Sequence, residues 1–237
     1  DHIQGIEYLD ELGLIKNFYY VDNNVSKSTE TESFKKYKDL KESSCAYKIY
    51  KGCKRKWMNV SDGERGSAGI SVLWPDVNNE TFRDALRDAE SSDKPNNISP
   101  AIVYSLDEGA RALWLGDMEN DYMEAIEDDI ALSPVDILFA PHHGRKSGRV
   151  PKTWLDKLDP RLIVVGKAPS DELEYYSNYN TLTQNSAGDI LFCCEAGKTH
   201  VYVGSPSYSV NFLDRDPNAS VVKGSLYYLG PFDCGDR

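Results

Sequence analysis

No apolar run in this 237-residue sequence approaches the length of a membrane span, so we expect no membrane segment in this chain. Cysteine is also scarce: there are five, an odd number, and no two have CxxC spacing. Cys193 and Cys194 are neighbours in a predicted strand, where successive side chains point to opposite faces. We therefore expect no disulfide framework and a reducing compartment, the cytoplasm.

Positive charge is in deficit overall but concentrated in one segment. The net charge of −11 argues against non-specific polyanion binding across the whole surface. Residues 35–56, however, hold nine Lys/Arg against two acidic residues, so the remainder carries −18. With Tyr37, Tyr47 and Tyr50 interleaved, such a stripe can hold a nucleic-acid backbone and stack bases. The alternative interpretation is a solvated helix face followed by a basic turn.

The sequence has no internal repeat and no low-complexity tract. Helical periodicity predicts helices over residues 3–12, 34–42, 78–90, 119–131 and 151–158. Runs rich in β-branched and aromatic residues predict strands over 14–22, 46–50, 69–76, 101–106, 111–116, 135–140 and 161–166, and a hairpin over 188–205. Short buried strands that alternate with helices, followed by a β-rich end, are typical of a layered α/β domain.

Histidine is scarce too, and three of the four histidines have unusual surroundings. His142 and His143 are adjacent in "LFAPHHGRKSG", directly after a predicted buried strand. His2 follows Asp1 where a predicted helix begins. His200 lies inside the predicted strand "THVYV", which favours a packing or hydrogen-bonding role over metal ligation.

A carboxylate occupies a similar position to the paired histidines. In "RALWLGDMEND" an apolar strand reaches Gly116 and is followed at once by Asp117. Side chains just past the ends of buried strands are held at the rim of the sheet, where ligands bind in layered α/β folds. Mixed His and Asp ligands suit zinc, manganese or iron rather than calcium. Each stretch alone has a structural explanation, as a turn or a surface loop, so their joint occurrence carries the metal-site hypothesis.

Four blocks in order carry a resemblance to a known family: "DHIQG", "NNISPAIVYSLDEGARALWLGDMEND", "ILFAPHHGRKSG" and "LDPRLIVVGK". They resemble the metallo-β-lactamase fold, in particular the nuclease-like domain of the DNA-uptake protein ComEC and its stand-alone relatives. That branch shows HxDxDHxGG, a paired-Asn strand entry, L-T-G-D, P-H-H-G-S and S-V-G-K/N. The resemblance implies an α/β fold, a four-layer αββα sandwich, for a hydrolase domain over residues 1–205. Residues 206–237 are then a β-rich tail or the start of an extension.

The resemblance also implies a site with two divalent transition-metal ions, zinc or manganese. Asp1 and His2 correspond to ligands of one ion, and Asp117 corresponds to the residue that bridges the two. One of His142 and His143 completes the ligands, and the sequence leaves open which. The other histidine orients substrate or gives a proton to the leaving oxygen. Asp1, Asp117 and the two adjacent histidines are thus the expected catalytic residues.

In this family the Asp-His pair closes an HxHxDH loop. The resemblance therefore implies that the first strands of the sandwich precede Asp1, with a pair of His or acidic ligands four and two residues upstream of it. We therefore expect that half of the site before Asp1 and not within these 237 residues.

Substrate contacts are expected from basic residues next to these blocks. Lys167 in "VVGKAP" matches the family's lysine or asparagine block, and Arg145, Lys146 and Arg149 follow the paired histidines. All four are expected near a substrate phosphate.

Three departures from the family pattern are visible. "HHGR" replaces HHGS and "LGD" replaces TGD. The later Y-G-H-P block corresponds to "LEYYSNYNTLT", which has no histidine, so Tyr176 or Asn178 would need to take its place.

These expectations describe a metal-dependent phosphodiester hydrolase, a DNA or RNA nuclease. A metal-activated hydroxide attacks the phosphodiester in line, while the metals and nearby Lys/Arg neutralise the developing charge. The expected partner is nucleic acid as substrate, and protein partners stay open. The alternatives are a small-molecule phosphoester or amide hydrolase of the same fold, and a catalytically degenerate scaffold or regulatory subunit, to which the missing late histidine points.

Overall fold

The computed structural model describes residues 2–235 apart from residue 93 and residues 214–223. Its centre is a six-stranded mixed sheet with the strand order β3-β4-β5-β6-β7-β8. The bounds are β3 Ile70–Trp74, β4 Ala101–Ser105, β5 Arg111–Trp114, β6 Ile137–Phe139, β7 Leu162–Val165 and β8 Thr181–Thr183. Strands β3, β4 and β5 pair antiparallel, whereas β5 to β8 are parallel. The carboxyl ends of the four parallel strands therefore meet at one edge of the sheet.

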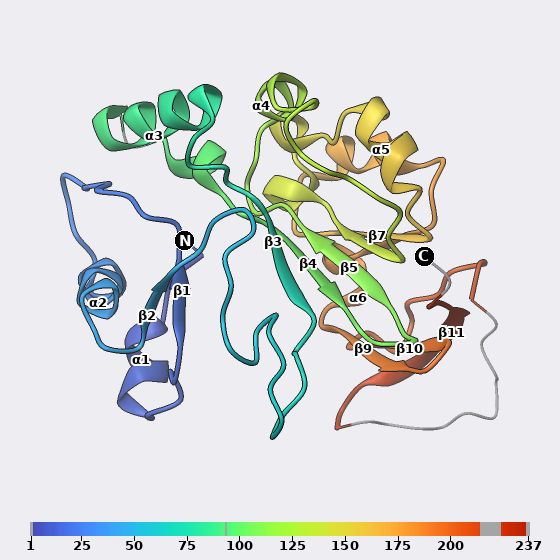
Figure 1. The fold of residues 1–237 in the computed structure, drawn as a ribbon. Helices are drawn as coiled ribbons and strands as arrows, with labels where there is room; N and C mark the ends of the chain where they lie inside the picture. The colour runs from blue at the N-terminus through green and yellow to red at the C-terminus, as the bar shows by residue number, and fades with distance from the viewer. Residues whose placement is uncertain (1, 93, 214–223, 236–237) are drawn as a thin grey trace.

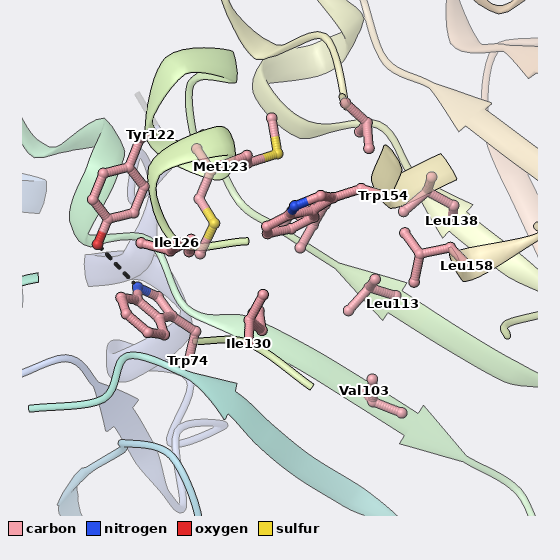
Figure 2. Packing of buried hydrophobic residues seen from close by; sticks show 14 of the residues in the cluster. Trp74, Val103, Leu113, Tyr122, Met123, Ile126, Ile130, Leu138, Trp154 and Leu158 are labelled. Carbon is pink, nitrogen blue, oxygen red and sulfur yellow. Dashed lines mark hydrogen bonds between the residues drawn. The ribbon is translucent and has the colours of Figure 1, made fainter. Parts of the chain in front are cut away.

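One face of this sheet is covered by α3 (Glu80–Ser92), α4 (Asn120–Ala125) and α5 (Lys152–Leu158), as Figure 1 shows. Helix α3 presents Phe82 and Ala89 to the sheet, and both are buried, as their helical spacing predicts. Trp74 and Trp154 lie in the same buried layer, and neither has exposed surface (Figure 2). Burial of these large aromatic side chains is a major contribution to the stability of the fold.

The other face is partly covered by a second, antiparallel sheet with the order β11-β10-β9. Its strands are β9 Ile190–Glu195, β10 Lys198–Val203 and β11 Tyr227–Asp233, and α6 (Gln184–Ala187) precedes it. Phe192 packs edge-to-face on Phe139 of the central sheet, with ring centroids 6.3 Å apart. Strand β11 comes from the expected tail 206–237 and pairs with the predicted hairpin.

The N-terminal part lies beside the β3 edge of the central sheet (Figure 1). It consists of α1 Ile6–Glu11, β1 Phe18–Tyr20, α2 Glu32–Lys41 and β2 Ala46–Lys48, and β1 and β2 form a parallel pair. The chain after β2 joins the β3 edge, because the Lys51 and Gly52 amides donate to the carbonyl oxygens of Pro75 and Val72 at 2.7 and 3.2 Å.

The structure confirms an α/β fold with a six-stranded mixed sheet and flanking helices, while the four-layer sandwich stays a prediction. Several predicted elements are shorter than expected: residues 119–131 form only α4, and residues 14–22 only β1. The five cysteines, all within the described residues, form no disulfide bond with one another. Among the helices of the described residues, none combines the length and apolar character needed to cross a membrane.

The hydrogen bond from Trp74 Nε1 to the Tyr122 hydroxyl, 3.0 Å long, is drawn in Figure 2 and is buried between β3 and α4. Tyr122→Phe removes the acceptor and leaves a buried indole N–H without a partner. We expect the free energy of unfolding in urea to fall by about 1–3 kcal/mol. The control Tyr8→Phe, at a side chain 67% exposed, should change it by less than about 0.5 kcal/mol. Equal stabilities for the two variants would contradict this account of the core.

Candidate metal centre

Asp117 is held by the turn that follows β5. Gly116 has a φ of 59°, a left-handed conformation, and a Cβ at this position would lie 2.6 Å from Cβ of Ser99. The hydroxyl of Ser99 accepts a hydrogen bond from the Asp117 amide at 3.0 Å. Gly116 and Ser99 together fix the backbone at Asp117, and therefore the direction in which its carboxylate points away from the sheet.

The chain just after Asp117 is clamped to the paired asparagines of the 3₁₀ turn η1 (Pro95–Ile98). The side-chain amides of Asn96 and Asn97 donate to the two carboxylate oxygens of Glu119 at 3.2 and 3.1 Å. The Glu119 amide in turn donates to Oδ1 of Asn97 at 3.0 Å. This reciprocal arrangement gives the paired-Asn entry a structural role, which is to position the loop that carries Asp117.

The paired histidines lie in the 3₁₀ turn η2 (Pro141–Gly144), directly beyond β6. His142 and His143 have φ values of 50° and 60°, a left-handed conformation that is uncommon for residues other than glycine. The His142 amide donates to the Gly116 carbonyl oxygen at 2.9 Å, which ties this turn to the one before Asp117. Strain of this kind, about 1–3 kcal/mol per residue, is concentrated at functional sites in proteins.

Three side chains from distant parts of the sequence converge at this edge of the sheet. His2 Nε2 lies 2.9 Å from Asp117 Oδ2, and the ring centroids of His2 and His143 are 5.0 Å apart. One nitrogen from each histidine and one carboxylate oxygen all lie within 4.8 Å of one another. The His2 side chain is 50% exposed and that of Asp117 is 17% exposed, so the cluster is open to solvent on one side.

The two adjacent histidines have different surroundings. His143 belongs to the three-residue cluster, whereas His142 Nδ1 forms a hydrogen bond of 3.0 Å with the Ser147 hydroxyl and lies outside the cluster. Burial lowers the pKa of His143; the Asp117 carboxylate opposes this effect, and nearby His2 and Arg145 add to it. The neutral imidazole is the form that binds a metal ion, so burial favours ligation by His143.

The other predicted site residues fall into two groups. Asp1 lies outside the described residues, so its ligand role stays a prediction. Arg145 and Lys146 are exposed in the loop after His143, and Lys167 is exposed directly after Gly166. A Cβ on that glycine would lie 3.0 Å from Cα of His143, so the Lys167 loop runs against the histidine turn. A role of these three cations in substrate binding stays a prediction.

Tyr176 is not available to replace the missing late histidine. Its side chain has no exposed surface, its hydroxyl accepts a hydrogen bond from the Val150 amide at 3.1 Å, and burial raises the pKa of its phenol. Asn178 lines a cavity of about 670 Å³ beside residues 209–212, and none of the three clustered residues lines that cavity. His200 bonds through Nδ1 to the Tyr228 hydroxyl at 2.8 Å, which confirms its hydrogen-bonding role.

Ser99, Glu119 and Ser147 position the site, but the sequence alone did not reveal them. Ser99 and Glu119 bond to groups 18 and 22 residues away that only the folded chain brings near, and Ser147 lies in the 3₁₀ turn η3 (Lys146–Gly148), where it bonds to His142. Their one common signal in the sequence is that they lie inside the quoted blocks, within a few residues of a predicted ligand or of the paired asparagines. Comparison with models of known protein families found none that matches this chain, and no curated protein matches it.

Gly116→Ala tests the turn that holds Asp117. The added methyl group would overlap Ser99 and would occupy a left-handed conformation, so we expect a loss of about 1–3 kcal/mol in the free energy of unfolding. The control is Gly63→Ala, where no atom lies within 4 Å of the new Cβ. Urea unfolding of both variants measures the difference, and equal stabilities would refute the described packing of Gly116 against Ser99.

Proposed function

We propose that His2, Asp117 and His143 bind a divalent transition-metal ion, zinc or manganese, and that the chain is a metal-dependent phosphodiester hydrolase. The single observation that carries the proposal is the convergence of these three side chains, with donor atoms within 4.8 Å of one another, at the edge where parallel strands end. Ligands in layered α/β folds bind at this edge.

The donor set fits such an ion. Two imidazole nitrogens and one carboxylate oxygen are ligands that zinc and manganese accept, and calcium prefers oxygen alone. Three protein ligands with an open side are typical of catalytic rather than structural zinc sites. Within the described residues these three donors form one group, so the proposal concerns one ion; Asp1, which the resemblance places on the same ion as His2, lies outside those residues.

An ion held there would supply Lewis-acid polarisation of a phosphoryl oxygen and a lowered pKa for water. The chain's own groups account for the remaining requirements. Burial lowers the pKa of His143, which favours the neutral imidazole that a metal ion binds. The Ser147 hydroxyl engages Nδ1 of His142, which leaves Nε2 as the nitrogen to orient substrate or to give a proton to the leaving oxygen. Arg145 and Lys146, both exposed in the adjoining loop, attract the phosphate.

We propose nucleic acid as the substrate, DNA or RNA. Support comes from the resemblance to a nuclease-like branch and from the exposed cations in the loop after the paired histidines. The small-molecule hydrolase and the non-catalytic scaffold are the competing functions, and both predict different outcomes in the experiments below.

Metal binding is tested by thermal unfolding of the 237-residue chain with and without Mn²⁺ or Zn²⁺. At about 100 times the dissociation constant, an ion that binds only the folded state stabilises it by about 2.7 kcal/mol, which raises the Tm by about 5–10 °C. We expect His143→Ala and Asp117→Asn to abolish this rise. His200→Ala is the matched control, because this histidine lies in β10 and bonds to Tyr228. A Tm indifferent to both ions would contradict the site.

Substrate class is tested by incubation with Mn²⁺ and, separately, plasmid DNA, single-stranded DNA, RNA and a small phosphodiester. We expect cleavage of a nucleic acid that falls at least about 100-fold in Asp117→Asn, because the ion contributes several kcal/mol to transition-state stabilisation. Turnover of the small diester alone would favour the small-molecule hydrolase. Metal binding without turnover of any substrate would favour the scaffold.

A further inference from the structure

A second candidate binding site lies in the N-terminal part of the molecule. A cavity of about 320 Å³ is lined by residues of β1, of β2 and of the loop that follows β2. Among its lining residues are Tyr19, Tyr47, Tyr50, Lys54 and Arg55. The three tyrosines are 37%, 36% and 43% exposed, so aromatic side chains line a hollow that is open to solvent.

Arg55 organises this hollow. Its Nε donates to the Tyr19 hydroxyl at 2.9 Å and its Nη2 donates to Oδ1 of Asn17 at 2.6 Å. The guanidinium group also stacks on the ring of Tyr47, and the ring centroids of Tyr19 and Tyr47 are 5.9 Å apart. The result is a preformed surface in which a fixed cation lies against exposed aromatic rings.

Most cations of the basic segment, residues 35–56, are paired with carboxylates, and two that are not lie at this hollow. Six of its nine cations have a carboxylate partner, and these pairs are Lys35–Glu32, Lys36–Asp10, Lys38–Glu30, Lys48–Asp22, Lys51–Asp76 and Lys56–Asp62. Lys41 donates to the carbonyl oxygen of Asn23. Among the described contacts, Lys54 and Arg55 have no carboxylate partner, and both line the cavity.

The structure therefore changes the interpretation of the basic stripe. The part on α2 is a solvated helix face whose lysines are mostly paired. Tyr37 is not available to stack a base, because its ring already packs against Phe34, Phe18 and Lys41. Tyr47 and Tyr50 stay exposed beside the two cations without carboxylate partners.

We propose that this hollow binds single-stranded nucleic acid, with bases stacked on Tyr47 and Tyr50 and phosphates paired with Lys54 and Arg55. Exposed aromatic faces combined with cations are the features that bind single strands without sequence preference. A duplex keeps its bases stacked on one another, so it cannot use the tyrosines. This proposal rests on the proposed function and extends it. It assigns the nucleic-acid substrate a second contact surface, formed by other residues than the metal cluster.

The test measures the anisotropy of a fluorescein-labelled oligothymidylate of about 12 nucleotides, a length within the usual range for such sites. The 237-residue chain is used in EDTA, so that binding is independent of metal and of hydrolysis. The variants are Tyr47→Ala, Tyr50→Ala and the double change Lys54→Ala/Arg55→Ala. The matched control is Lys35→Ala/Lys38→Ala, which also removes two cations of the same segment, both of them paired.

Each tyrosine variant should weaken binding about fivefold or more, the effect of losing one stacked base. The Lys54/Arg55 double variant should reduce the slope of log K against log salt by about 1.4, as two lost phosphate contacts require. The control should change affinity less than about twofold. Should Tyr47→Ala fail to fold, Tyr50→Ala tests the same stacking, since its side chain has the larger exposure of the two.

Affinity unchanged in the tyrosine and double variants would overturn the proposal. The proposal would also be overturned if heparin displaced the labelled oligothymidylate as well as unlabelled oligothymidylate does and Tyr50→Ala lost no affinity. That result would describe a surface that binds any polyanion. Failure here would leave the metal-dependent rise in Tm intact, and failure of the metal site would leave oligonucleotide binding intact, so the two proposals fail separately.

Discussion

The hydrogen bond from the His142 amide to the Gly116 carbonyl oxygen joins the turns beyond two neighbouring parallel strands, β5 and β6. Parallel strands end at the same edge of a sheet, so Asp117 and His143 start from adjacent positions before any side chain is considered. The hydrogen bond then fixes the two turns against each other. The convergence with His2, and the metal site we propose, depends on this connection.

The surroundings of these turns restrict their movement. His142 and His143 adopt left-handed backbone conformations, and Gly166 packs so closely on His143 that a side chain there would have little space. On the other turn, Ser99 holds the Asp117 amide, and the asparagine–glutamate contacts hold the next residues. A strained turn supported on several sides is the expected form of a preorganised site, because ligand atoms must be placed within about 0.5 Å. Arg55 likewise fixes the hollow that we propose as a strand-binding site, through its hydrogen bonds to Tyr19 and Asn17.

The sequence predicts the central sheet well because its strands are short apolar runs separated by turn residues, and the burial of Leu113, Leu138 and Ile163 agrees with this. It also predicts Asp117 and the paired histidines as site residues from their positions just beyond strands. It cannot separate His142 from His143, because the ring directions depend on two unusual φ angles. It overstates the basic stripe for a related reason: Asp10, Asp22 and Asp76 neutralise its lysines across long sequence separations.

We propose that His2 and His143 are ligands of one ion, whereas His142 and His200 are not. Long-range ¹H–¹⁵N spectra of the four imidazoles, recorded while Zn²⁺ is added, test it residue by residue. We predict that about one equivalent shifts the nitrogen resonances of His2 and His143 together and fixes their tautomers, as direct ligation requires. The resonances of His200 should stay unchanged, and those of His142 should keep the pattern of a ring bonded to Ser147. Spectra in which His2 and His143 do not respond, or respond no more than His200, would contradict the account.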